Sequence, residues 1–143
     1  MISFFVPGTP VAKGSAKAFY NRNARKIVTM QDNGDKQKPW ASMISYCAQE
    51  KGFKVSSGGF MIYLMFRMPR PKSHYGTGKN SSKLKDNAPD WHTGKPDLDK
   101  LVRCVKDALT GIVWKDDSQV SFLSAGKIYS EKPGVKIEVG EVF

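Results

Sequence analysis

The chain has 143 residues, which is the size of one domain and enough to bury a hydrophobic core without disulfides. With 40% hydrophobic residues and no apolar run long enough to cross a bilayer, the composition excludes a membrane-spanning protein. The formal net charge of +10 favours a polyanionic partner, of which nucleic acid is the commonest. The N-terminus lacks a signal-peptide pattern, and Cys47 and Cys104 show no metal-binding spacing. We therefore expect one cytoplasmic domain, residues 1–143, with free thiols and no membrane contact.

The first half of the chain predicts two strands, a helix and a loose hairpin. Residues 2–6, "ISFFV", are apolar and β-prone and predict a strand. The basic stretch that follows could hold a loose hairpin, with residues 26–30 as its better strand. Residues 38–52 repeat apolar side chains every three or four positions, which indicates an amphipathic helix with Pro39 in its first turn. Residues 59–68 are apolar and aromatic, which predicts a central strand buried on both faces.

The second half predicts a long loop, a helix and a hairpin. Residues 69–96 show no periodicity and are rich in turn residues, as in functional or disordered loops. A helix follows and ends at Gly111, and residues 119–130 and 134–143 alternate as strands around an "EKPG" turn. The order β-(β)-α-β-α-β-β predicts an α+β fold, a mixed sheet with two main helices packed on it.

The positive charge is concentrated in two segments. Residues 13–38 and residues 67–95 each carry seven Lys or Arg against two Asp, so together they account for the whole excess. A merely solvated basic surface is the alternative, but a scattered surplus would not gather in this way. We expect the two segments to bind a phosphate backbone, and the predicted DNA contacts are Lys13, Lys17, Arg22, Arg25, Lys26, Arg70, Lys72, Lys79, Lys83, Lys85 and Lys95.

The acidic residues are also concentrated. Five of the thirteen carboxylates fall between residues 94 and 120. On a helical wheel an apolar face of Leu101, Val102, Val105, Ala108 and Leu109 predicts the core side of the second helix. Asp99, Arg103 and Lys106 share one polar stripe. If residues 97–99 are extended, which Pro96 favours, the carboxylates of Asp97 and Asp99 point to one side and the helix begins at or near Asp99. Simple helix capping is the alternative for one of these two residues.

A third carboxylate could join them from the turn after the helix. Asp116 and Asp117 could be ordinary turn residues, or the returning chain could bring one of them beside the helix start. Three clustered carboxylates repel one another unless a cation lies between them, and hard oxygen ligands suit Mg²⁺ or Mn²⁺. Such an ion can generate a hydroxide nucleophile, and Arg103 or Lys100 can help to stabilise the charge on a phosphate.

These residues resemble the motif region of the RusA family of Holliday-junction resolvases. The segments "KPDLDKL", "KDALTG" and "WKDDSQV" match in order and spacing, and the opening "ISFFVPGTPVAKGSAKA" is similar to the family's N-terminal strand and basic segment. The resemblance implies a homodimeric, Mg²⁺-dependent endonuclease that nicks four-way DNA junctions in symmetric pairs, without a small-molecule cofactor. Many such proteins are encoded by phages or prophages. It implies catalytic, metal-binding carboxylates at Asp97, Asp99 and Asp117, with Asp116 the weaker candidate.

The sequence departs from this family pattern at two positions. Arg103 stands where the family has its catalytic lysine, and Lys100 where it has asparagine. Arginine keeps the charge and can grip a phosphate, but it cannot readily give up a proton. His92 could bind a phosphate or polarise water, or be a plain surface residue. Rival functions are a DNA-binding module without catalysis, a nuclease acting on RNA or other branched substrates, and a basic scaffold protein.

Overall fold

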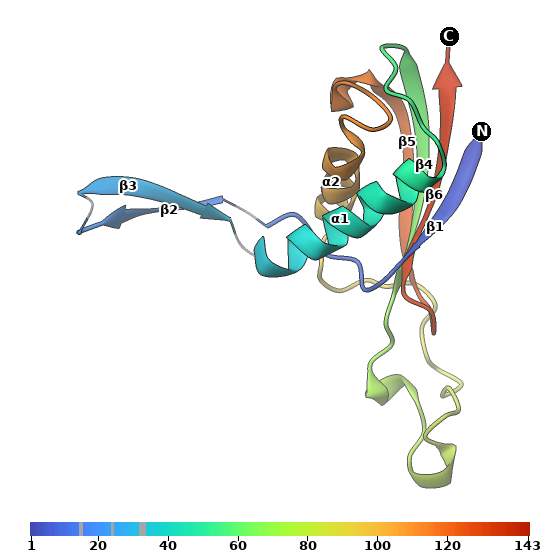
Figure 1. Ribbon diagram of the computed structural model, residues 1–143. Helices are drawn as coiled ribbons and strands as arrows, with labels where there is room; N and C mark the ends of the chain where they lie inside the picture. Colours follow the sequence, from blue (N-terminus) through green and yellow to red (C-terminus); the bar gives the residue numbers. More distant parts are fainter. Residues whose placement is uncertain (15, 24, 32–33) are drawn as a thin grey trace.

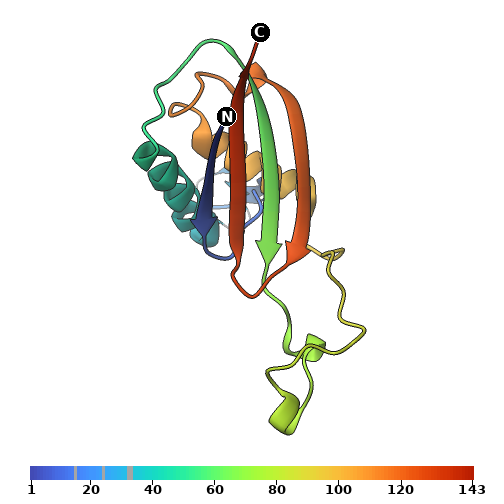
Figure 2. The ribbon, with the colours of Figure 1, turned by 90° about the vertical axis from the view of Figure 1, so that its right-hand side faces the viewer.

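The body of the protein is a four-stranded mixed sheet with two helices on one face, in a computed structural model that describes residues 1–14, 16–23, 25–31 and 34–143. In the order β1-β6-β4-β5, the pairs β1/β6 and β6/β4 are antiparallel and β4/β5 is parallel. Figure 2 shows this sheet face-on with both helices behind it. The elements are β1 (Ile2–Pro7), α1 (Gly34–Glu50), β4 (Gly59–Met68), α2 (Leu98–Leu109), β5 (Val120–Tyr129) and β6 (Gly134–Val142). The α+β class and the element order are those predicted.

The central strand β4 corrects one prediction. Its side chains alternate between full and partial burial, so it is not buried on both faces. The helices cover one face of the sheet only, and the residues that point to them are Phe60, Ile62, Leu64, Phe66 and Met68. The opposite face carries the half-buried alternates, including Tyr63 and Arg67. An antiparallel or mixed sheet with one open face gives this alternation.

Both helices bury one stripe against the sheet and against each other. Helix α1 begins four residues before the predicted start, so Pro39 lies inside it rather than in its first turn. Its stripe of Trp40, Ile44 and Ala48 is buried, and Gly52, at φ 77°, follows its end. Helix α2 buries a wider stripe that includes Leu101, Val105 and Leu109, as the wheel predicts. The stripe fixes which face of α2 is left to solvent.

Two extensions leave this body. We call residues 16–31 the β-arm: strands β2 (Ala16–Asn21) and β3 (Lys26–Gln31) pair as a separate antiparallel sheet, which confirms the predicted hairpin. Figure 1 shows the β-arm projecting on the helix-covered side of the sheet. We call residues 69–96 the basic loop; it hangs below the sheet and contains two short 3₁₀ turns, Lys72–His74 and Gly78–Asn80.

The two cysteines are free, as expected. Cys104 is buried in the helix layer, and burial, followed by the nearby Asp107 carboxylate, raises the pKa of its thiol to about 11. The thiol is therefore protonated at neutral pH and acts as a core side chain. Within the described residues, neither helix has the length and apolar character needed to span a bilayer.

Candidate active site

An open groove lies between α2 and β5. It has a volume of about 540 Å³ and is lined by Leu98, Asp99, Val102, Arg103, Lys106, Asp117, Leu123 and Ala125. Two carboxylates and two cations therefore share one concave surface. Asp99, Arg103 and Lys106 come from the polar stripe of α2, and Asp117 comes from the turn that leads into β5. The groove is the place where two of the three predicted acids, Asp99 and Asp117, meet the predicted Arg103.

The start of α2 separates Asp97 from Asp99. The helix begins at Leu98, and Asp97 occupies the N-cap position with extended angles, φ −65° and ψ 139°. Its carboxylate makes no capping hydrogen bond, so capping does not account for this residue. Asp99 lies in the first helical turn, where the positive end of the helix dipole favours a negative charge.

The two adjacent acids after the helix have different roles. The Asp116 carboxylate accepts a hydrogen bond from the Ser118 backbone N–H at 2.8 Å, and this bond is the main cause that lowers its pKa. Asp116 is the N-cap of the short 3₁₀ turn Asp117–Gln119, where it forms a capping box with Gln119. Because Asp116 is used in the turn, Asp117 is the acid that reaches the groove.

Gln119 fixes this turn to the rest of the fold, a role that sequence reasoning missed. Its Oε1 accepts from the backbone N–H groups of Lys115 and Asp116 at 2.8 and 2.9 Å. Its Nε2 donates to the carbonyls of Ser56 and Gly58, just before β4, at 2.8 and 2.7 Å. The available signal was the spacing of Asp116 and Gln119, which is that of a capping box.

The donor set of the groove fits a magnesium-type ion only in part. Among the described residues, no group of three or more His, Cys, Asp or Glu side chains is arranged to hold a metal ion. The expected cup of Asp97, Asp99 and Asp117 is thus not found among these residues, although Asp97 is extended and the helix begins one residue before Asp99, close to the predicted start. Mg²⁺ commonly uses only one or two carboxylates together with water and substrate phosphates, so Asp99 and Asp117 suffice chemically. Each residue's assignment as a ligand stays a prediction.

The cations around α2 differ from the prediction in one respect. Arg103 and Lys106 line the groove, whereas Lys100 is not part of its lining. The Lys100 backbone carbonyl instead accepts a hydrogen bond from the Lys13 N–H at 3.1 Å. The Lys13 ammonium is paired with the Asp107 carboxylate. This segment therefore ties the root of the β-arm to the outer face of α2.

A second unpredicted anchor holds the chain in front of Asp97. The Lys127 ammonium, from β5, donates to the carbonyls of Gly94 and Pro96. His92 lies against the Tyr129 ring, 4.9 Å between centroids, and its backbone N–H donates to the Lys127 carbonyl at 3.2 Å. Burial, followed by the Lys127 charge, lowers the His92 pKa. His92 is thus placed outside the groove lining, in a packing role at the end of the basic loop.

Arg70 is a clear correction among the predicted DNA contacts. Its side chain is only 7% exposed. Its Nη1 donates to the Pro89 carbonyl at 2.7 Å, and its guanidinium lies 5.3 Å from the centre of the Tyr129 ring and near Asp90. Arg70 therefore closes the neck of the basic loop instead of facing solvent.

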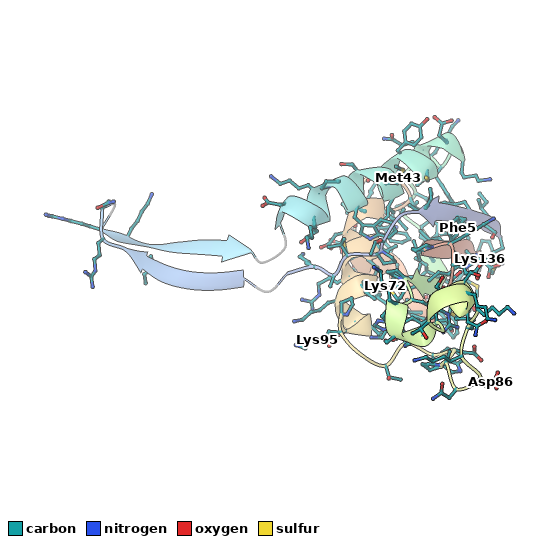
Figure 3. The ribbon with its side chains drawn as sticks, turned by 90° about the horizontal axis from the view of Figure 1, so that it is seen from below. Phe5, Met43, Lys72, Asp86, Lys95 and Lys136 are labelled. Atoms are coloured by element: carbon teal, nitrogen blue, oxygen red, sulfur yellow. The ribbon has the colours of Figure 1, made fainter. Side chains whose placement is uncertain are left out.

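The other predicted DNA contacts are mostly accessible. Lys13 is half-buried by its pairing with Asp107, and the side chain of Lys17 lies outside the described part of the structure. The exposed ones are Arg22, Arg25, Lys26, Lys72, Lys79, Lys83, Lys85 and Lys95. Seen from below, Lys95 lies near the body on the side of the β-arm, and Lys72 lies in the basic loop (Figure 3). The exposed cations thus lie in two extensions of the body, the β-arm and the basic loop.

Comparison with known proteins identifies the class. The family model described as endodeoxyribonuclease RusA matches residues 7–140. The chain belongs to this family of endodeoxyribonucleases.

Two curated relatives are similar to it. It is 37% identical over 145 residues to the uncharacterized protein YqaN of Bacillus subtilis (strain 168), covering 99% of this chain and 96% of that protein. It is 42% identical over 53 residues to the crossover junction endodeoxyribonuclease rusA of Lactococcus phage r1t, covering 36% of this chain and 40% of that protein.

Proposed function

We propose that the chain is a metal-dependent endodeoxyribonuclease that resolves four-way DNA junctions by paired hydrolytic nicks, in cytoplasmic DNA recombination and repair. The observation that supports this proposal is the groove in which Asp99, Asp117 and Arg103 meet, in a chain with a net charge of +10. Two acids in a phosphate-binding protein would repel the substrate unless a cation lay between them. Family membership supports the reaction class.

Asp99 and Asp117 are the residues that would hold Mg²⁺, or Mn²⁺ in its place. When bound, the ion makes water a stronger nucleophile and stabilises charge on the phosphate. Asp97 is the candidate for a third carboxylate, since its side chain is exposed and makes no capping bond. No small-molecule cofactor is part of the proposal.

Arg103 would bind and orient the scissile phosphate. Its guanidinium presents two parallel N–H donors to phosphate oxygens. Arginine does not serve as a proton donor in proteins, so another group must supply the proton that the leaving oxygen needs when the P–O bond breaks. That proton comes from water or from an ammonium, and Lys106 is the lysine that lines the groove.

Symmetric cutting of a four-way junction needs two active sites that face equivalent strands. We therefore include a homodimer in the proposal, because one chain carries one groove of this composition in the part of the structure that is described.

The test is cleavage of a synthetic four-way DNA junction, with linear duplex and a branched RNA as competing substrates. The wild-type protein should nick the junction with Mg²⁺ or Mn²⁺ and stop in EDTA. Asp99→Asn and Asp117→Asn should each abolish nicking and keep or improve junction binding, because removing a negative charge reduces repulsion of phosphate. Asp97→Asn, measured in parallel, decides whether the third carboxylate takes part.

Asp86→Asn is the matched control. It makes the same charge change on an exposed residue of the basic loop, outside the groove, and should leave nicking unchanged. Binding without any nicking in the wild-type protein would support a DNA-binding module instead. Preferential cutting of the RNA would support the RNA-directed nuclease, and loss of both binding and nicking in the Asp variants would refute the metal-site assignment.

A further inference from the structure

The β-arm carries positive charge without any acidic residue. Residues 16–31 contain Lys17, Arg22, Arg25 and Lys26 and no Asp or Glu, so the arm has a formal charge of +4. Three of these cations lie at or beside the tip, where their side chains are exposed. Ile27, next to them, is 72% exposed, so the tip is not packed against the body. Figures 1 and 3 show the arm extending away from the helices.

The backbone at the tip of the β-arm adopts a conformation that is uncommon for a residue with a long side chain. Arg25 has φ 51°, in the left-handed region that glycine or asparagine usually occupies. A glycine there would ease the turn, yet the position holds a guanidinium. Strained positions in a structure point to a function for the residue that occupies them.

The root of the arm is tied to the helix that carries the candidate site. The Lys13 N–H donates to the Lys100 carbonyl at 3.1 Å, and the Lys13 ammonium pairs with Asp107. The Gly14 N–H donates to Gln37 Oε1 of α1 at 3.3 Å. The arm therefore leaves the body from contacts with both helices, and one of them is the helix of Asp99 and Arg103.

The length of the arm matches a defined distance along DNA. Six residues per strand at about 3.4 Å each give a reach of about 20 Å. Successive phosphates of one strand advance by about 3.4 Å along the axis, so this reach corresponds to about 6 base pairs. A two-stranded β-ribbon also fits the major groove, which is about 12 Å wide.

We propose that the β-arm is a second DNA-binding element, which lies along a duplex arm of the junction and sets its basic tip against phosphates about 6 base pairs beyond the point where the β-arm leaves the body. This inference rests on the proposed function, because it takes DNA as the substrate. A second copy of the chain is a poorer occupant, since an arm of charge +4 would approach a protein of charge +10.

The experiment compares the double variant Arg22→Ala/Arg25→Ala with the wild-type protein. The matched control is Lys51→Ala/Lys54→Ala, which removes two exposed cations between α1 and β4. Junction binding is measured by fluorescence anisotropy in EDTA over a range of NaCl concentrations. One junction has arms of about 20 base pairs, and the other has hairpin-closed arms of about 4 base pairs, shorter than the reach of the tip.

On the long-armed junction, the tip variant should bind about tenfold or more weakly. Its slope of log affinity against log salt should be shallower by about 1.8, because each of the two phosphates that the tip no longer neutralises accounts for about 0.9 of the slope. On the short-armed junction, the tip variant should bind as the wild-type protein does. The control variant should show no difference that depends on arm length.

If the tip variant lost affinity equally for both junctions, the proposal would be overturned, because the β-arm would then act only through general electrostatic attraction. No loss on the long-armed junction would also overturn it, and so would a change of oligomeric state in sedimentation, which would make the arm a contact between copies. The outcomes separate from those of the proposed function. If the loss of affinity in the tip variant depends on the length of the junction arms but the wild-type protein never nicks DNA, only the proposed nuclease activity is refuted. If the wild-type protein nicks DNA and the tip variant binds normally, only the DNA-binding role of the β-arm is refuted.

Discussion

Gln119 offers the sharpest test of how Asp117 is positioned. Gln119→Leu keeps the size of the side chain but removes all four of its hydrogen bonds, two within the turn and two to the segment before β4. Each such bond contributes about 0.5–1.5 kcal/mol net. Three of the four are exposed, where water can replace the missing partner, so we expect unfolding free energy to fall by about 1–2 kcal/mol.

The effect on cleavage should be larger than the effect on stability. A displacement of about 1 Å in a reacting group can lower a rate about 100-fold, so we expect a 10- to 100-fold loss in kcat under conditions where the variant is folded. Urea unfolding gives the stability, anisotropy in EDTA gives the affinity, and single-turnover cleavage of the junction gives the rate.

Gln119→Glu and Gln49→Leu complete this test. Gln119→Glu keeps an acceptor for Lys115 and Asp116 but loses both donated bonds, so it should behave like Gln119→Leu in cleavage. Gln49→Leu makes the same change on the exposed side of α1 and should affect neither quantity. If Gln119→Leu loses stability but cleaves at the wild-type rate, then the position of this turn does not matter, and Asp117 is not part of the reacting site.

Three further outcomes follow from contacts around the groove. Lys127→Met should lower kcat/KM and reduce the free energy of unfolding by about 1–3 kcal/mol, because two carbonyls that precede Asp97 lose a charged donor. Junction cleavage measures the first quantity and urea unfolding the second. Unchanged cleavage would show that the segment before Asp97 needs no such anchor. Arg103→Lys should keep measurable cleavage and Arg103→Met should lose it, if the residue supplies charge; complete loss in both would show that the guanidinium's shape is needed. The third concerns His92, whose pKa in the folded protein is lowered below 6.5 by burial and then by the charge of Lys127. As the pH falls, the imidazole of the unfolded chain is therefore protonated before that of the folded protein. Stability should therefore fall as the pH drops from 6.5 toward the lower folded-state pKa, and His92→Phe should flatten that part of a curve of urea midpoint against pH; an unchanged curve would contradict the assignment.

Local periodicity predicted the elements well. The structure confirms the apolar stripe of α2 and places the last two strands within about one residue of their predicted bounds, although burial alternates only along β6 and not along β5. The same wheel put Asp99, Arg103 and Lys106 on one side, and all three line the groove. The predicted start of α1 is late because proline is typical of a first helical turn, whereas this helix begins before Pro39.

Long-range hydrogen bonds could not be predicted in this way. Gln119 reaches carbonyls 61 and 63 positions away, and Arg70 and Lys127 reach across 19 and more than 30. Nothing in the sequence near a glutamine, an arginine or a lysine shows which distant carbonyl it will meet. The prediction that Arg70 binds DNA rests on charge alone, and it is wrong because the fold uses this residue to close a loop. Three carboxylates gathered for an ion are not found among the described residues, and local sequence could not decide this because Asp117 reaches the groove from a separate turn after α2.

The parallel pairing of β4 with β5 also has a consequence for how such a protein can change. Two parallel neighbouring strands need a crossover connection, and residues 69–119 form the connection between β4 and β5. Arg70 contacts Pro89 and Asp90 and so joins the two ends of the basic loop. Lys127 then holds the chain just before α2 through two hydrogen bonds to backbone carbonyls. Residues 71–88 therefore hang below a closed ring of contacts. Insertions, deletions or altered charge within residues 71–88 can therefore change the surface of the basic loop without altering the contacts that hold the groove between α2 and β5.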